Sequence, residues 1–289
     1  MIGYGATPPD VTWPGGARVA VSIVVNVEEG AELSILDGDE RNESIYEARE
    51  EVVGAPDPCM TSHFGYGPRR GYWRIAECLA RHGVQATFST CGRAAEATPW
   101  LIKDAAERGH EISCHGWRWE RHAGMDEATE RDIIAKTHAT LAQISGIPPV
   151  GWHTRSAATV NTRRLLIEHG GFLYDSDAYD DDLPYLTGGH DHPHVILPYA
   201  FDTNDMRFQP GGGFITGEDF ASYCLTAFDR LSREGRGAMM SVGLHLRLIG
   251  KPARIDGLDM LLEGIHQRGG AWIATRREIA AHWRQTFAP

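Results

Sequence analysis

Short apolar runs rich in β-branched residues alternate with amphipathic segments along the whole chain, and this alternation limits the possible folds more than any other feature. Residues 18–27 (RVAVSIVVNV) predict a buried strand. We expect further strands at 85–89, 111–115, 150–153, 173–176, 195–198, 238–246 and 272–274. Periodicity and end signals predict helices at 72–82, 98–109, 126–146, 161–169, 218–234, 254–268 and 276–283. About seven βα units predict a parallel sheet, closed or nearly closed into a barrel.

The chain is expected to form one domain, since no internal repeat, low-complexity segment or linker divides residues 1–289. Two segments, 28–70 and 178–194, interrupt the alternation and are expected to be long loops. Loops of this length in a compact barrel are more often functional than idle. We therefore expect these loops to contribute to function.

Composition excludes several classes of function. A net charge of −11 argues against a nucleic-acid or anionic-membrane partner. Five cysteines, without a CxxC pair, argue against a disulfide framework or a zinc knuckle. The N-terminus resembles no secretion signal, and the longest apolar run, residues 19–27, is far shorter than the roughly 20 residues of a membrane helix. We expect a soluble cytoplasmic enzyme.

Carboxylates and imidazoles follow several of the predicted strands at their carboxyl ends, where barrel enzymes place their active sites. The residues at these ends are Glu28, Glu29, His115, His153, Asp175, Asp177 and His245. Because the ends of parallel strands meet at one rim, we expect these side chains to converge on one site.

Each of these residues also has a structural interpretation. Glu28 and Glu29 could begin an acidic surface loop, and adjacent strand residues point to opposite faces unless the strand ends or bulges. His115 and His245 could be core histidines with satisfied hydrogen bonds, and Trp119 could pack between barrel and helix. The acidic run 180–182 fits a loop or a helix cap.

The ordered set of strand-end residues resembles the polysaccharide deacetylase superfamily, whose NodB homology domain is a distorted (β/α) barrel. The family's first motif (TFDD) corresponds to residues 26–29 (NVEE), its second begins at His115, and its Leu-x-His motif corresponds to 243–245 (GLH). The resemblance covers essentially the whole chain. It implies that Glu28 is the general base, that Glu29 and His115 hold metal-ligand positions, and that His245 is the general acid.

Departures from the family pattern narrow the resemblance to one subgroup. Trp119 stands at the position of the second ligand histidine, so a three-ligand metal site is incomplete. The stretches 115–119 (HGWRW), 174–185 (YDSDAYDDDLPY) and 201–208 (FDTNDMRF) resemble the metal-independent allantoinases and cyclic imide hydrolases. The resemblance therefore implies no metal cofactor; a metal, if bound, would use Glu29 and His115.

The pocket mouth is expected to differ from that of an allantoinase. Segments 153–158 (HTRSAA) and 61–67 (TSHFGYG) depart from the pattern of those enzymes, which favours a flatter cyclic imide over allantoin. The candidate substrate-binding residues are His63, Trp119, His153, Arg155 and Arg207.

The expected reaction opens a small cyclic amide ring by attack of water on a ring carbonyl. Glu28, sharing its proton with Glu29, would take the proton of water, because two neighbouring carboxylates raise one pKa. His115 or backbone N–H groups would stabilise the oxyanion, and His245 would protonate the leaving nitrogen. The alternatives are a metal-dependent polysaccharide or peptidoglycan N-deacetylase and a non-catalytic binding barrel. A homo-oligomer is expected.

Overall fold

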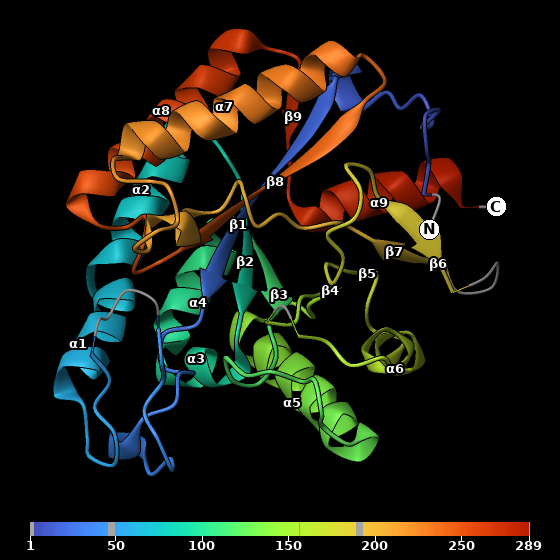
Figure 1. Ribbon diagram of the computed structural model, residues 1–289. Coiled ribbons are helices and arrows are strands. Elements are labelled where there is room, and N and C mark those ends of the chain that lie inside the picture. Colours follow the sequence, from blue (N-terminus) through green and yellow to red (C-terminus); the bar gives the residue numbers. More distant parts are fainter. Residues whose placement is uncertain (1–2, 46–49, 156, 189–192, 289) are drawn as a thin grey trace.

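The computed structural model describes residues 3–45, 50–155, 157–188 and 193–288 and shows a single α/β domain with a curled half-barrel sheet (Figure 1). The strands follow the order β6-β7-β5-β4-β3-β2-β1-β8, and β9 pairs with β1. The predicted distorted (β/α) barrel is confirmed. The strands are β1 (Val19–Val27), β2 (Thr87–Thr90), β3 (Glu111–Cys114), β4 (Gly151–Trp152), β5 (Tyr174–Asp175), β6 (Tyr185–Thr187), β7 (His194–Ile196), β8 (Ala238–His245) and β9 (Ala271–Ile273).

Helices surround the sheet and bury its outer face (Figure 1). They are α1 (Pro58–Tyr66), α2 (Tyr72–Arg81), α3 (Gly92–Ala97), α4 (Pro99–Glu107), α5 (Glu127–Ser145), α6 (Thr162–His169), α7 (Gly217–Glu234), α8 (Pro252–Arg268) and α9 (Arg276–Phe287). Within the described ranges, no helix is both long enough and apolar enough to span a membrane.

Strand β1 lies next to the edge strand β8, and it pairs with β2, β8 and β9. All nine of its residues are buried. The parallel register aligns the carboxyl ends of neighbouring strands; the aligned pairs are Asn26–His245, Val27–Thr90, Thr90–Cys114 and Cys114–Trp152. One residue further along, Glu28, His115 and His153 therefore reach the same level. Register alone brings these predicted site residues to one rim.

Strand β8 is an edge strand of the sheet. There Asn204 forms an isolated parallel bridge with Gly243, whose N–H donates to the carbonyl oxygen of Thr203 at 3.0 Å. A Cβ at Gly243 would lie 2.3 Å from the side chain of Asn204, so this close approach requires glycine. The contact holds the short 3₁₀ helix η4 (Asp205–Phe208) beside the end of β8.

The two segments expected to be loops contain short elements. Helix α1 lies within 28–70, and its sequence signals are Asp57, whose side chain accepts from the N–H of Met60, followed by Pro58 at the first helical position. Strand β6 lies within 178–194 and pairs antiparallel with β7. Pro184 directly before β6 weakened its strand signal, since proline is confined to strand starts and edges. Helix α3 was also missed.

Candidate active site

A cavity of about 400 Å³ opens at the carboxyl ends of the strands, where the sequence predicted the site. Its walls combine charged groups from the strand ends with aromatic side chains from the loops. The lining residues include Asn26, Glu28, His115, Trp119, Arg121, His153, Arg155, Tyr199, Phe201, Asn204, His245 and Arg247.

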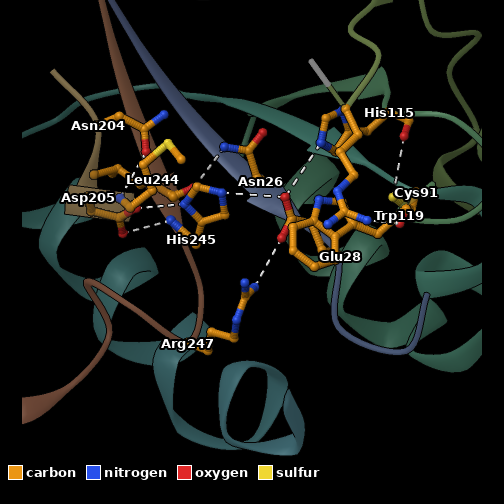
Figure 2. Close-up of polar contacts among 12 residues, drawn as sticks. Asn26, Glu28, Cys91, His115, Trp119, Asn204, Asp205, Leu244, His245 and Arg247 are labelled. Carbon is orange, nitrogen blue, oxygen red and sulfur yellow. Dashed lines mark hydrogen bonds and ion pairs between the residues drawn. The ribbon is translucent and has the colours of Figure 1, made fainter. Parts of the chain in front are cut away.

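Glu28 is the central group of the cavity floor (Figure 2). Its Oε1 lies 3.5 Å from Nε2 of His115 and 3.4 Å from Nε2 of His245, while Nη1 of Arg247 donates to Oε2 at 3.0 Å. Burial by itself would raise the pKa of Glu28. The positive charges of His245 and Arg247 and hydrogen bonds from both imidazoles outweigh burial and hold the pKa well below its usual range. Glu28 is therefore a carboxylate at neutral pH.

His245 is oriented by Asp205, the first residue of η4 (Figure 2). Its Nδ1–H donates to Oδ1 of Asp205 at 2.6 Å, and its backbone N–H donates to Oδ2 at 2.8 Å. The N–H of Ile249 also donates to Oδ2, which fixes the carboxylate between two backbone groups. Burial would lower the pKa of His245, but the carboxylates of Glu28 and Asp205 raise it to about 10. His245 is therefore an imidazolium at neutral pH.

His115 is held by a contact with the backbone of His153. Its Nδ1 lies 2.6 Å from the carbonyl oxygen of His153, which can only accept, so Nδ1 carries a proton and Nε2 faces Glu28. The two rings stack with centroids 4.9 Å apart. Burial and the neighbouring His115 hold the pKa of His153 well below its usual range, so His153 is neutral.

Glu29 lies behind the cavity floor and does not line the cavity. Its Oε1 accepts from the backbone N–H of Arg247 at 3.1 Å and lies 3.6 Å from Nη1 of that residue. A Cβ at Gly67 would lie 2.7 Å from the Glu29 carboxylate, so α1 ends against this group. Burial raises the pKa of Glu29 to about 7 against the effect of Arg247. The raised pKa expected of the pair thus belongs to Glu29, whereas that of Glu28 is lowered.

The candidate substrate-binding residues divide into two groups. Trp119, His153 and Arg155 line the cavity. His63 lies on α1 with its ring against Phe64 and does not line the cavity. Arg207 also lies outside it, because its guanidinium donates to the carbonyl oxygens of Gly212 and Asp202 and packs over two aromatic rings. Of the five candidates, His63 and Arg207 are thus the two that the structure does not bring to the cavity.

Three residues near the cavity were not predicted from the sequence: Asp205, Arg247 and Arg121. Asp205 belongs to the segment 201–208 that carried the resemblance, but its contact with His245 depends on the bridge to β8. Arg247 lies two residues after the end of β8, and this position close to a strand end could have identified it from the sequence. Arg121 follows Trp119 at the same spacing in the loop after β3.

The donor set around Glu28 does not suit the metal site of the wider family. Trp119 offers no ligand atom, and the Glu29 carboxylate is engaged by the backbone and guanidinium of Arg247. That guanidinium, which repels a metal cation, contacts both glutamates. In the described part of the chain, three ligand-type side chains approach one another within 4.8 Å only at Cys78, His82 and Asp259, between α2 and α8.

Comparison with known proteins places the chain among relatives of the same fold and length. Residues 53–172 match the family described as Polysaccharide deacetylase. A Schizosaccharomyces pombe relative assigned to the polysaccharide deacetylases is 36% identical over 98% of this chain and 96% of its own. A crystal structure of a probable polysaccharide deacetylase from Pseudomonas aeruginosa PAO1 is 42% identical with a TM-score of 0.95, covering 100% of this chain and 98% of the other.

The crystal structure of PuuE allantoinase is similarly related, at 42% identity and a TM-score of 0.94, with coverage of 100% of this chain and 98% of that one. A structure from Mycobacterium smegmatis is 26% identical with a TM-score of 0.83, covering 97% of this chain and 95% of the other. Full-length identity and the shared fold agree with the resemblance in the strand-end motifs. The chain belongs to the polysaccharide deacetylase family of hydrolases.

Proposed function

We propose that this chain hydrolyses a small cyclic amide, an imide or a related ureide, by attack of water on a ring carbonyl without a metal ion. The observation that carries the proposal is the buried Glu28 carboxylate, held between two imidazoles and a guanidinium on the cavity floor. The 42% identity to PuuE allantoinase over the whole chain supports the reaction class.

The charge states of Glu28 and His245 on the cavity floor suit a general base and a general acid that act together. Glu28 is a carboxylate and can accept a proton from water as the water oxygen attacks the carbonyl carbon. His245 is an imidazolium and can give a proton to the ring nitrogen as the C–N bond breaks. The guanidinium of Arg247, which also lines the cavity, supplies positive charge near the developing oxyanion.

The leaving nitrogen explains how such a site could work without a Lewis acid. When the ring C–N bond breaks, negative charge on an imide or ureide nitrogen spreads onto the carbonyl group that stays attached to it. This nitrogen therefore leaves more easily than the amine nitrogen of an N-acetylated sugar, which keeps no carbonyl group. Segment 153–158 departs from the allantoinase pattern and contributes His153, Arg155 and Ala157 to the cavity lining. This departure favours an imide or another ring over allantoin. Ser156 of that segment lies outside the described residues.

The test is a hydrolysis panel on protein dialysed against EDTA. The panel contains succinimide, phthalimide, dihydrouracil, hydantoin, allantoin and an N-acetylglucosamine oligomer. We expect turnover of at least one ring, a higher kcat/KM for a small imide than for allantoin, and no gain when zinc is restored. The Glu28→Gln variant is the control for contaminating activity.

Two results would contradict this proposal. Release of acetate from the oligomer only after zinc is restored would support a metal-dependent deacetylase. Binding of rings without turnover would support a non-catalytic barrel. The homo-oligomer and the cytoplasmic location expected from the sequence stay predictions, as does the assignment of a single small-molecule partner.

A further inference from the structure

The cavity has a floor and a rim with different roles. The floor groups are deeply buried, with Glu28 only 2% and His245 9% exposed. The rim carries two further arginines: Arg155, with a side chain 29% exposed, and Arg121, which is exposed to solvent. Both arginines line the same cavity as the floor groups.

Arg155 is held in place by its surroundings. Its guanidinium lies over the Trp119 ring, with Cζ 3.5 Å from the ring centroid. Its Nη1 donates to the carbonyl oxygen of Trp119 at 2.8 Å and lies 3.4 Å from Oε1 of Glu43. Among the described residues, Nε and Nη2 have no hydrogen-bond acceptor. A guanidinium has five N–H groups in a rigid fork, so this fixed side chain retains donors that match a carboxylate.

Arg121 adds a positive charge that no acidic side chain balances among the described residues. The backbone that carries it is fixed, because the N–H groups of His122 and Ala123 both donate to the carbonyl oxygen of Ala157, at 3.1 and 2.8 Å. Glu43 offsets the charge of Arg155, and two glutamates offset that of Arg247. The cavity mouth therefore has a surplus positive charge, although the chain as a whole has a net charge of −11.

We propose that the physiological substrate is a cyclic amide with an anionic substituent, such as a carboxylate, which Arg155 and Arg121 bind at the rim. The inference rests on the proposed function. On the floor the charges of Glu28, His245 and Arg247 already pair with one another, whereas Arg155 retains unused donors at the rim. With the anion at the rim, the ring carbonyl points toward Glu28 and His245. A volume of about 400 Å³ accommodates a small ring with a short side chain.

The experiment compares two rings that differ by one carboxylate side chain, hydantoin-5-acetic acid and hydantoin. We expect a kcat/KM at least about tenfold higher for the acid at low ionic strength, falling as salt screens the rim charges. Arg155→Gln and Arg121→Gln should each lower this ratio toward one. Arg131→Gln is the matched control, because Arg131 lies on α5, away from the cavity, where it pairs with Glu127 and Glu168.

Binding to the Glu28→Gln variant, measured by calorimetry, separates this inference from the proposed reaction. If hydantoin is opened as fast as the acid, or if the arginine variants keep the preference, the inference is wrong and the proposed function stands. If neither ring is opened, tighter binding of the acid that is lost on Arg155→Gln supports the inference alone. Equal binding of both rings overturns it.

Discussion

Two buried histidine–carboxylate pairs, His245 with Asp205 and His122 with Glu130, contain the same chemical groups in different surroundings. In each pair Nδ1 of the imidazole contacts a carboxylate oxygen, at 2.6 Å for His245 and 3.0 Å for His122. Only the first pair reaches the cavity, where Nε2 of His245 lies 3.4 Å from Glu28. A buried histidine–carboxylate pair therefore does not by itself indicate a catalytic role. The two pairs differ in whether Nε2 of the imidazole faces the cavity.

In the pair of His122 and Glu130, hydroxyl groups occupy the remaining acceptors of the carboxylate. Thr159 and Thr162 both donate to the carboxylate of Glu130, so the start of α6 is joined to α5 through this group. At the first pair the corresponding acceptors of Asp205 are used by backbone N–H groups, which leaves the imidazole facing Glu28. Glu130 joins elements of the fold, whereas Asp205 orients a group that can react.

The largest expected effect comes from replacing the glutamate beside each histidine, Glu28 beside His245 and Glu130 beside His122. Glu28→Gln keeps the shape but removes the proton acceptor, so kcat should fall roughly 10²–10⁴-fold. Glu130→Gln should keep most of kcat and lower the free energy of unfolding by about 1–3 kcal/mol, since buried donors lose a carboxylate. Steady-state kinetics and thermal unfolding of both variants test this. Near-full kcat in a folded Glu28→Gln protein would place the base elsewhere, with Glu29 the next candidate.

A comparable loss is expected at the imidazole that faces the cavity. His245→Asn should lower kcat by roughly 10²–10⁴-fold on a ring with a poor leaving nitrogen. The loss should shrink on rings whose leaving nitrogen is more acidic, because such a nitrogen needs less protonation. Rates for a series of N-substituted or ring-substituted imides would show the trend. A penalty independent of leaving-group acidity would make His245 a binding residue.

A smaller effect is expected for the carboxylate that orients this imidazole. Asp205→Asn should lower kcat about 10–100-fold, since Asp205 acts only through His245. Asp205 helps to raise the pKa of His245 to about 10, so wild-type activity should persist to alkaline pH, and the alkaline limb should move to lower pH in the variant. A pH–rate profile measures this shift. An unchanged alkaline limb would reduce Asp205 to a structural role.

The different outcomes at these sites show what the sequence could predict. Glu28, His115 and His245 were identified because strand register alone brings the ends of β1, β3 and β8 to one rim. Asp205 was missed because its contact depends on the tertiary approach of segment 203–205 to β8, which no local pattern encodes.

The position of Arg207 likewise depends on tertiary structure, and its side chain does not reach the cavity. It shares helix η4 with Asp205, and residues two apart in a helix of three residues per turn point to different sides. Only one of the two can face β8, and that residue is Asp205. The strands and most helices were predictable because apolar periodicity is local. Local signals were weaker for helix α1, which contains Gly65, and for β6, whose three residues are half-buried.

The smallest expected effect concerns Glu29, the carboxylate behind the floor, and appears in stability. Its pKa is raised to about 7 from an ordinary value of 4.5, so the folded protein holds this proton more tightly than the unfolded chain does. Its stabilising contribution is complete below pH 4.5 and is lost as pH rises through 7. A carboxylate of lowered pKa such as Glu28 has the opposite pH dependence.

The Glu29→Gln variant carries no titrating proton at this position. Its free energy of unfolding should therefore rise by about 1–3 kcal/mol relative to that of the wild type between pH 5 and pH 8. Urea unfolding of both proteins at these two pH values measures the difference. A constant difference would show that Glu29 is already ionised at pH 5, and the guanidinium of Arg247 would then outweigh burial.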